Sequence, residues 1–350
     1  MRIVQKRHRR WPGALPSWAM TETTRPVVFC SWTFSEAGLS LLRDVADVHV
    51  WPGPAAAPRD ALLEELRGGA AAVFAVPPTD RLDAEAMDAG KQLRVISGFG
   101  VGFDYVDVAE ATRRGILVCN TPGTLTETTA DQAWALLMAA ARNTTRGDSY
   151  MRSRQWKGYD PALLLGADIH GATLGVVGLG AIGAAVARRA TGFGMRVLYT
   201  GRSRKPELEA AAGAEFRSLD DLLRESDFVS LNCALTPETR GLIGERELGL
   251  MKRSAILVNT ARGAVVDQRA LATALKAGTI AAAGIDVYVQ EPIAPDDPLL
   301  ECETAVLVPH LGSATHATRA RMSRVACQNI VDGLAGRRPA HLVNPQVWRG

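Results

Sequence analysis

A glycine-rich turn between a buried strand and a helix constrains the fold of this chain more than any other feature. The apolar run at residues 173–177 predicts a short buried strand, and residues 182–193 predict a helix. Gly178-x-Gly180-x-x-Gly183 joins them. The first glycine permits a tight turn, the second lets the backbone approach a pyrophosphate, and the third lets helix and strand pack closely. A second predicted strand at residues 196–200 completes a dinucleotide-binding βαβ unit.

The residues after this second strand bear on the choice between NAD and NADP. An NAD enzyme usually carries Asp or Glu about 20 residues after the glycine motif, to bind the ribose 2′-hydroxyl. Here no acidic residue lies between positions 183 and 206, and the chain carries Arg202, Ser203 and Arg204 instead. Because a guanidinium group can bind phosphate through two parallel hydrogen bonds, this segment favours NADPH, with NADH as the second possibility.

Three polar residues follow three further predicted strands. Arg262 comes after the apolar segment 255–259, Glu291 after 281–286, and His310 after 305–308. Open α/β sheets bind their ligands at the carboxyl ends of the strands, so we expect these three side chains to meet at one edge.

The chemistry of these three side chains indicates an enzyme that reduces a ketone. Arg262 can bind a substrate carboxylate and polarise the adjacent ketone. His310 can donate a proton to the forming alkoxide while hydride arrives from a nicotinamide. Glu291, hydrogen-bonded to the far imidazole nitrogen, would stabilise the imidazolium. Together they predict reduction of a 2-keto acid with a nicotinamide cofactor.

These motifs make the chain similar to the D-isomer-specific 2-hydroxyacid dehydrogenases, most of all to their glyoxylate/hydroxypyruvate reductase branch. The resemblance spans nearly everything from Val27 to Pro345, and it implies NAD(P)H-dependent reduction of glyoxylate or hydroxypyruvate to glycolate or D-glycerate. It also implies that Arg262, Glu291 and His310 are catalytic. Besides the glycine turn, the matching segments are Ser97-Gly-Phe-Gly-Val-Gly-Phe-Asp104, Asn259-Thr-Ala-Arg-Gly263, Asp286-Val-Tyr-Val-Gln-Glu-Pro292 and Pro309-His-Leu-Gly-Ser-Ala-Thr315.

The resemblance further implies which residues bind the ligands. The backbone at Val101 and Gly102 is expected to hold the substrate carboxylate, and Asp286 to have a supporting role. The expected substrate site consists of Val76, Val101, Gly102, Arg262 and His310. The expected cofactor site consists of Gly178, Leu179, Gly180, Ala181, Ile182, Gly183, Gly201, Arg202, Ser203, Arg204, Ala234, Thr239, Thr260, Ala261, Asp286, His310 and Gly312.

Other activities within the same fold remain as alternatives. Formate dehydrogenases resemble this chain but have Gln in place of Glu291, and phosphite dehydrogenases have Lys in place of Val101, so both are disfavoured. A D-lactate or aromatic D-2-hydroxyacid dehydrogenase that uses NAD is a second enzyme hypothesis. A nucleotide-sensing regulatory module of the same fold is a hypothesis of a different class.

The predicted architecture is α/β, with two doubly wound parallel-sheet domains. A Rossmann cofactor domain at 120–310 is inserted into a flavodoxin-like substrate (lid) domain at 25–119 and 311–345. In the lid domain, strands are expected at 27–31, 71–76, 94–97 and 117–119, and helices at 36–46, 59–67, 83–90 and 107–114. A long helical stretch from 126 to about 152 and a final helix at roughly 314–334 are also expected, and the resemblance implies a homodimer interface on the former.

Composition excludes several classes of protein. The 350 residues are 47% hydrophobic and 22% charged, as in globular domains, and we find no apolar run of membrane-spanning length. Five scattered cysteines suggest a reducing compartment rather than a metal site or disulfides, so we expect a cytoplasmic protein.

Charge is concentrated at the N-terminus. Five basic residues and no acid lie in residues 1–20, so the remainder carries a net charge of −2 and nucleic-acid binding is not indicated. We expect residues 1–24 to be a disordered extension, or translation to start at Met20.

Overall fold

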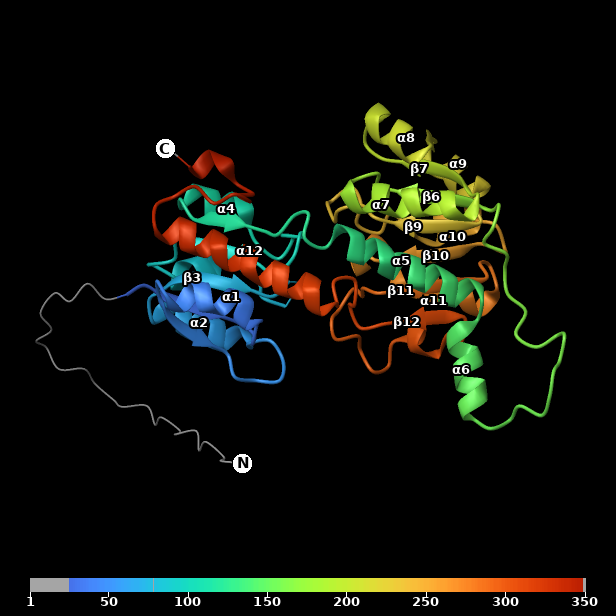
Figure 1. The fold of residues 1–350 in the computed structure, drawn as a ribbon, viewed down its shortest axis with the longest axis horizontal. Helices are drawn as coiled ribbons and strands as arrows, with labels where there is room; N and C mark the ends of the chain where they lie inside the picture. The colour runs from blue at the N-terminus through green and yellow to red at the C-terminus, as the bar shows by residue number, and fades with distance from the viewer. Residues whose placement is uncertain (1–24, 78, 349–350) are drawn as a thin grey trace, which may run out of the picture.

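Two parallel β-sheets form two domains that lie side by side along the long axis of the molecule (Figure 1). The structure is a computed structural model, and it describes residues 25–77 and 79–348. The hypotheses about residues 1–24 therefore lie outside the described residues. The strand order is β2-β1-β3-β4-β5 in one sheet and β12-β11-β10-β9-β6-β7-β8 in the other. These are the flavodoxin-like and Rossmann orders, so the predicted fold class is confirmed.

The five-stranded sheet lies in the part of the chain predicted as the lid domain, and this name is kept for it below. Helix α12 returns to this domain from the far end of the chain and packs against α1 and the face of the sheet at β3 and β4. The strands are β1 (Val27–Cys30), β2 (Asp47–Val50), β3 (Ala70–Ala75), β4 (Val95–Gly98) and β5 (Leu117–Cys119). The helices are α1 (Glu36–Arg43), α2 (Arg59–Arg67), α3 (Ala84–Ala89), α4 (Val108–Arg113) and α12 (His316–Leu334), followed by the short 3₁₀ helix η4 (Pro345–Val347).

The cofactor domain contains the seven-stranded sheet. Its strands are β6 (Thr173–Val177), β7 (Arg196–Thr200), β8 (Ala214–Phe216), β9 (Phe228–Leu231), β10 (Ile256–Asn259), β11 (Ala282–Ile285) and β12 (Ala305–Leu307). Its helices are α5 (Thr126–Ala141), α6 (Thr144–Arg152), α7 (Ala181–Ala190), α8 (Pro206–Ala212), α9 (Leu219–Glu225), α10 (Glu245–Leu250) and α11 (Gln268–Ala277), with 3₁₀ turns η1 (Thr191–Phe193), η2 (Gly263–Val265) and η3 (Pro298–Glu301).

Every strand predicted from the sequence is present, with each end within one residue of its predicted position. Strands β2 and β8 were not predicted, because they are short edge strands with exposed charged or polar positions that weaken the apolar pattern. Strand β9 was also not predicted, although its residues are all buried and its apolar sequence is typical of a central parallel strand.

The stretch predicted to be helical, 126 to about 152, is helical but is divided into two helices. Helix α5 ends at Ala141, Asn143 has a φ of 52°, and α6 begins at Thr144. A returning loop causes the break, since the N–H of Ala167 donates to the carbonyl of Ala141 (2.8 Å) and the Asn143 side chain donates to the carbonyl of Leu165 (3.0 Å). The first bond satisfies a carbonyl that a continuous helix would use itself, and the second ties Asn143 to the returning loop.

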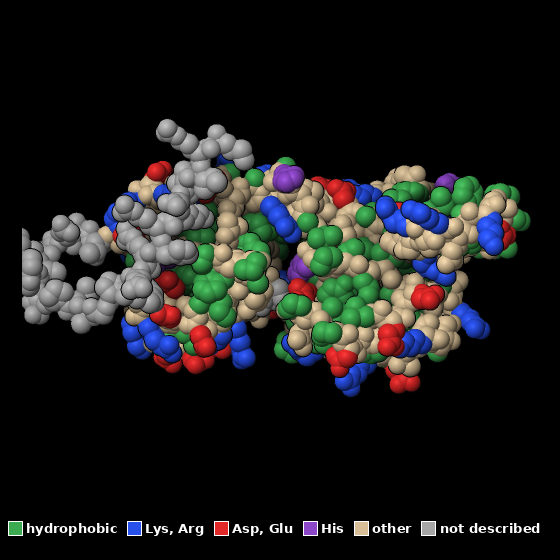
Figure 2. Space-filling view, turned by 90° about the horizontal axis from the view of Figure 1, so that it is seen from below, with side chains coloured by type: hydrophobic (Ala, Val, Ile, Leu, Met, Phe, Trp, Pro, Cys, Tyr) green, Lys and Arg blue, Asp and Glu red, His purple; other side chains and the backbone are tan. Residues whose placement is uncertain are grey.

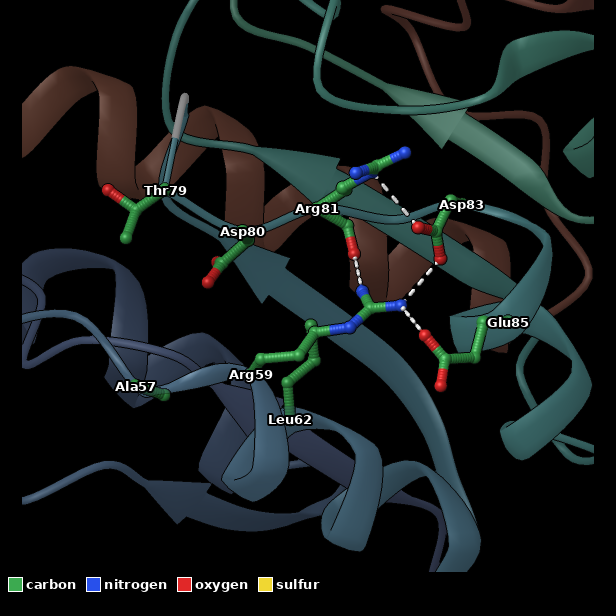
Figure 3. A pocket seen from close by; sticks show the side chains of 8 residues that line it. All are labelled: Ala57, Arg59, Leu62, Thr79, Asp80, Arg81, Asp83 and Glu85. Atoms are coloured by element: carbon green, nitrogen blue, oxygen red, sulfur yellow. Dashed lines mark hydrogen bonds and ion pairs between the residues drawn. The ribbon is translucent and has the colours of Figure 1, made fainter. Parts of the chain in front are cut away.

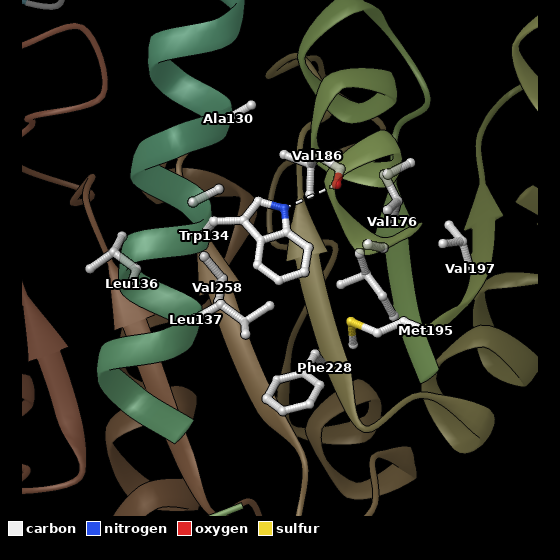
Figure 4. Close-up of a cluster of buried hydrophobic side chains, with 14 of the residues drawn as sticks. Ala130, Trp134, Leu136, Leu137, Val176, Val186, Met195, Val197, Phe228 and Val258 are labelled. Atoms are coloured by element: carbon white, nitrogen blue, oxygen red, sulfur yellow. Dashed lines mark hydrogen bonds between the residues drawn. The ribbon is translucent and has the colours of Figure 1, made fainter. Parts of the chain in front are cut away.

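Helix α5 packs against α7 and against β10 and β11 of the cofactor sheet, and the side chain of Trp134 anchors it to α7 and η1. This side chain is 4% exposed, stacks on Phe193 with a centroid distance of 4.7 Å, and donates its indole N–H to the carbonyl of Val186 (3.0 Å). Figure 4 shows Trp134 between α5, α7 and the strands of the sheet. Trp134 therefore satisfies its one polar atom while it buries a large apolar surface.

We predict that Trp134→Ala lowers the free energy of unfolding by about 3–5 kcal/mol, because it removes a large buried side chain and leaves the carbonyl of Val186 without its donor. Denaturant unfolding followed by circular dichroism would measure this loss. Leu300→Ala is the control, since Leu300 is 46% exposed in the same domain. Equal losses for both variants would show that Trp134 is not a principal core contact.

Candidate functional site

The three predicted catalytic side chains follow three neighbouring strands. Arg262 follows β10, Glu291 follows β11, and His310 follows β12, and these strands are adjacent and parallel in the sheet. Their carboxyl ends therefore lie at one edge, which faces the lid domain. The space-filling view shows a narrow hollow between the two domains, with a histidine side chain at its margin (Figure 2).

Glu291 and His310 form the hydrogen bond that the sequence predicted. Nδ1 of His310 lies 2.7 Å from Oε2 of Glu291, and the other carboxylate oxygen accepts the N–H of Tyr288 (3.1 Å). Burial alone would raise the pKa of Glu291, but the hydrogen bond from His310 and the positive charges of His310 and Arg262 hold this pKa below its ordinary value. Glu291 is therefore a carboxylate at neutral pH, and the Nε2 atom of His310 is left for another partner.

His310 has an unusual backbone conformation that Asp286 supports. Its φ is 54°, in the left-handed region that residues other than glycine seldom adopt. The carboxylate of Asp286 accepts the N–H groups of Leu311 (2.5 Å) and Gly312 (2.8 Å), and the carbonyl of Asp286 accepts the N–H of His310 (2.9 Å). Burial raises the pKa of Asp286, whereas these backbone donors lower it, and the net direction is upward. The supporting role expected of Asp286 thus corresponds to three hydrogen bonds around His310.

Arg262 contacts the lid domain directly. Its Nε donates to Oδ1 of Asp104 (2.9 Å) and its Nη1 donates to the carbonyl of Ala261 (2.8 Å). A Cβ atom on Gly102 would collide with Nη2 of Arg262, so only glycine fits here without displacing the guanidinium group. Gly102 and Arg262 were both predicted in the substrate site. Asp104 was missed, although it ends one of the matching motifs.

The loop that contains Val101 is attached to the junction between the domains. Nδ2 of Asn120 donates to the carbonyl of Val101 (2.8 Å), and the N–H of Thr121 donates to the carbonyl of Gly100 (2.8 Å). Asn120 was predicted as the start of the cofactor domain, but its bond to the loop of Val101 was not. Val76, also predicted at the substrate, lies just after β3, where it packs half-buried against a lid-domain core cluster.

The glycine turn has the geometry expected for a nucleotide. Gly178 has a φ of 94°, and a Cβ there would meet the backbone of Cys233 at 2.8 Å. A Cβ on Gly183 would collide with the carbonyl of Gly178, whereas the space beside Gly180 is open. The turn therefore leaves backbone accessible at the start of α7, where N–H groups and the helix dipole favour phosphate.

Two buried polar atoms also fit a bound dinucleotide. Oδ1 of Asn232 and Oγ1 of Thr260 have no hydrogen-bond partner among the described residues. They follow β9, which is next to β6, and β10, which is next to β9, so both lie on one side of the glycine turn at the same sheet edge. Because buried polar atoms normally have partners, these two are available to a ligand.

The other residues predicted at the cofactor also follow strands of this sheet. In the loop after β9, Oγ1 of Thr239 donates to the carbonyl of Ala234 (2.7 Å). By position, Leu179, Ala181 and Ile182 lie in the turn and the start of α7, Gly201 and Ser203 after β7, Ala261 after β10, and Gly312 after β12.

Arg202 and Arg204 differ in their surroundings. Arg204 forms an ion pair with Glu209, with Nη2 2.7 Å from Oε2, and lies over the ring of Phe216. Among the described residues no hydrogen bond or ion pair engages Arg202, which is exposed. A ligand phosphate would therefore compete with Glu209 for Arg204 but not for Arg202.

Metal-ligand clusters and membrane-spanning helices are absent from the described part of the chain. No group of three or more His, Cys, Asp or Glu residues with the geometry to hold a metal ion is found there. None of the helices between residues 25 and 348 is both long and apolar enough to cross a membrane.

Comparison with known proteins gives matches over most of the chain. The family described as "D-isomer specific 2-hydroxyacid dehydrogenase, NAD binding domain" matches residues 134–312. A glyoxylate reductase from Korarchaeum cryptofilum is 50% identical over 324 residues, which is 92% of this chain and 97% of that protein.

Solved structures match equally widely. A protein from Thermus thermophilus is 46% identical, with a TM-score of 0.84 over 91% of this chain and 99% of its own. The NADPH-dependent glyoxylate/hydroxypyruvate reductase of Sinorhizobium meliloti, in complex with NADP and malonate, is 30% identical, with a TM-score of 0.82 over 93% of this chain and 99% of its own.

We predict that Asp104→Asn raises the KM for the anionic substrate about tenfold, because it weakens a charged hydrogen bond that orients Arg262. In an Arg262→Lys background, Asp104→Asn should have little further effect on this KM, since the guanidinium group that Asp104 orients is already absent. Steady-state kinetics of the four proteins of this cycle would measure the coupling.

Asp107→Asn is the control for the double-mutant cycle of Asp104 and Arg262. Asp107 lies three residues further along and caps α4 through the N–H of Glu110 (2.9 Å). Asp107→Asn should therefore change the free energy of unfolding but leave the KM for the anionic substrate unchanged. Additive effects of Asp104→Asn and Arg262→Lys would argue against the orienting contact.

Proposed function

Because the chain belongs to the D-isomer specific 2-hydroxyacid dehydrogenase family, we propose that it reduces glyoxylate and hydroxypyruvate to glycolate and D-glycerate. The observation that carries this proposal is the 2.7 Å contact between His310 and Glu291 at the sheet edge that also bears Arg262. A proton donor, its carboxylate partner and a fixed cation are what reduction of a 2-keto acid needs from a protein.

Each side chain has one role in this reaction. Arg262 binds the substrate carboxylate and polarises the neighbouring ketone, since its Nη2 faces the backbone of Gly102. Nε2 of His310 donates a proton to the carbonyl oxygen as it becomes an alkoxide. Glu291 fixes the ring of His310 through Nδ1 and stabilises the imidazolium before transfer.

The nicotinamide cofactor, when bound, supplies the hydride that the keto carbon receives. The N–H groups at the glycine turn and the start of α7 would hold its pyrophosphate, and the unpartnered Asn232 and Thr260 would hydrogen-bond to its other polar groups. We propose that NADPH is preferred to NADH. The absence of an acidic residue in the segment 183–206 and the exposed Arg202 support this preference.

The substrate would lie between the two domains. The backbone of Val101 and Gly102 would bind its carboxylate together with Arg262, and Val76 would contact its tail. The apolar character of Val76 and Val101 supports a small uncharged tail, as in glyoxylate and hydroxypyruvate. We assign residues 25–119 and 311–345 to the lid domain and residues 120–310 to the cofactor domain. The membership of the two sheets supports this division, and closure between the domains would exclude water.

We also propose a homodimer in the cytoplasm. Large apolar side chains are exposed on and after α6, which projects from the cofactor domain together with the following loop (Figure 1). Such a surface is unfavourable in water and is typical of an interface. The exposed apolar side chains on and after α6 are Met151, Trp156, Tyr159 and Leu165. The five free cysteines support a reducing compartment.

The first experiment follows the loss of absorbance at 340 nm (the NAD(P)H signal) with four keto acids, each supplied with NADPH and with NADH. We predict the highest kcat/KM for glyoxylate and hydroxypyruvate with NADPH. Higher efficiency with pyruvate or phenylpyruvate would instead favour a D-lactate or aromatic 2-hydroxyacid dehydrogenase. Tight nucleotide binding without any turnover would favour a sensing module. His310→Gln is the control, because it removes the proton donor and should abolish turnover while nucleotide affinity is retained.

The cofactor preference can be tested at Arg202 and Arg204. We predict that the double variant Arg202→Ala with Arg204→Ala shifts the NADPH/NADH ratio of kcat/KM toward NADH by at least about tenfold, since each contact with a phosphate contributes roughly 1.5–3 kcal/mol. Arg202→Ala alone should produce most of the shift, because Glu209 already neutralises Arg204. Arg224→Ala, at an exposed position on α9, is the control. An unchanged ratio in the double variant would rule out this phosphate site.

A further inference from the structure

The carboxylate of Asp80 is buried in the lid domain and connects the ends of two strands. It is 2% exposed. Its Oδ2 accepts the hydroxyl of Ser31, which follows β1, and the N–H of Val76 (2.7 Å), which follows β3. The N–H of Asp80 returns a bond to the carbonyl of Val76 (3.0 Å). We refer to these contacts among Asp80, Ser31 and Val76 as the Asp80 bracket.

The Asp80 bracket adjoins the segment that leads to the substrate loop. The N–H of Phe99 donates to the carbonyl of Ala75 (2.8 Å), directly before Val76. A Cβ on Gly100 would lie 3.5 Å from Cγ of Pro77. Val76 and Pro77 therefore pack beside the residues that continue into Val101 and Gly102, and Gly102 in turn contacts Arg262.

Charged groups surround Asp80, but none compensates its charge. A cavity of about 310 Å³ is lined by Asp80 together with Arg59, Arg81, Asp83 and Glu85. The guanidinium of Arg59 is directed at Asp83 (2.6 Å) and Glu85 (2.7 Å), away from Asp80 (Figure 3). Arg81 pairs with Asp83 at 3.0 Å.

Burial therefore dominates the ionisation of Asp80. It raises the pKa of Asp80 to about 6, although the bonds from Ser31 and Val76 act in the opposite direction. The buried phenol of Tyr105 belongs to the segment after β4, and the charge of Asp80 helps to raise the pKa of this phenol. An ionised Asp80 thus costs stability at neutral pH, and a residue that costs stability beside a site is a candidate for function.

We propose that Asp80 is a positioning residue for the keto-acid site, whose buried carboxylate holds Val76 and Pro77 against the segment that carries Val101 and Gly102. This inference rests on the proposed function, because it assigns the loop after β3 to the wall of the substrate pocket. Asp80 acts through the loop backbone and does not contact the substrate.

The bracket makes substrate binding depend on pH. An ionised carboxylate oxygen accepts hydrogen bonds about twice as strong as those of a neutral group. The bracket is therefore strongest well above pH 6 and weakens as the pH falls through about 6, the pKa of Asp80. In the wild type the KM for glyoxylate should rise over this interval, while kcat changes less.

Asp80→Asn tests the proposal because it places a neutral acceptor at the same position. We expect the KM for glyoxylate at pH 7.5 to rise about tenfold, with kcat within about twofold and nucleotide affinity unchanged. The rise in KM below pH 6 should disappear, and the thermal midpoint at pH 7.5 should not fall. Asp83→Asn is the matched control, since Asp83 lines the same cavity and caps α3, so its loss should lower the midpoint but leave KM unchanged.

A readout without turnover separates this proposal from the proposed function. Hydrogen-exchange mass spectrometry compares the backbone amides of the peptide that covers Val76 at the same pH in each protein. These amides should exchange faster in Asp80→Asn and in Ser31→Ala than in the wild type. Faster exchange with a raised KM supports the bracket, and faster exchange still supports it if the wild type reduces no keto acid. Unchanged exchange, unchanged KM, or a fall in nucleotide affinity that parallels the rise in KM would overturn it.

Discussion

Parallel pairing of the strands is the constraint on which the rest of this structure depends. Every paired strand in both sheets runs parallel to its neighbour, so each connection must cross over the sheet, and all carboxyl ends in a sheet share one edge. The edge of the cofactor sheet carries the glycine turn, Arg262, Glu291 and His310, and the edge of the lid sheet carries Val76 and Val101. The α/β topology alone thus brings together residues that are more than 200 positions apart.

Buried carboxylates hold both edges in position. Asp286 supports the left-handed backbone of His310, and Asp80 holds the loop after β3. Such groups oppose stability: the shift of the Asp80 pKa from 3.8 to about 6 corresponds to a cost of about 3 kcal/mol. Because folding raises the pKa of Asp80, ionised Asp80 is less favourable in the folded protein than in the unfolded chain. The cost is present above pH 6, where folded and unfolded states are both ionised, and it disappears as the pH falls below about 4.

Contacts between the domains determine the geometry of the site. Arg262 belongs to the cofactor sheet, but its guanidinium group is oriented by Asp104 and bounded by Gly102, both from the lid domain. Asn120, at the junction, holds the carbonyl of Val101. Movement of one domain relative to the other would therefore change the orientation of Arg262 and the position of the substrate loop together, which is how closure can align a site.

The sequence by itself determined the α/β class, the positions of the predicted strands and the candidate catalytic residues, because apolar periodicity and glycine turns are local properties that do not depend on the rest of the chain. It did not reveal the end of α5 at Ala141, which a loop more than 20 residues later imposes through Ala167. Nor did it reveal the contacts that Asp80, Asp104 and Asn120 make, since an Asp or Asn in a loop has the same sequence signature whether it is solvated or positions another residue. Only the tertiary structure decided these roles, because burial and hydrogen bonding between distant segments arise when the two sheets and their connections are packed together.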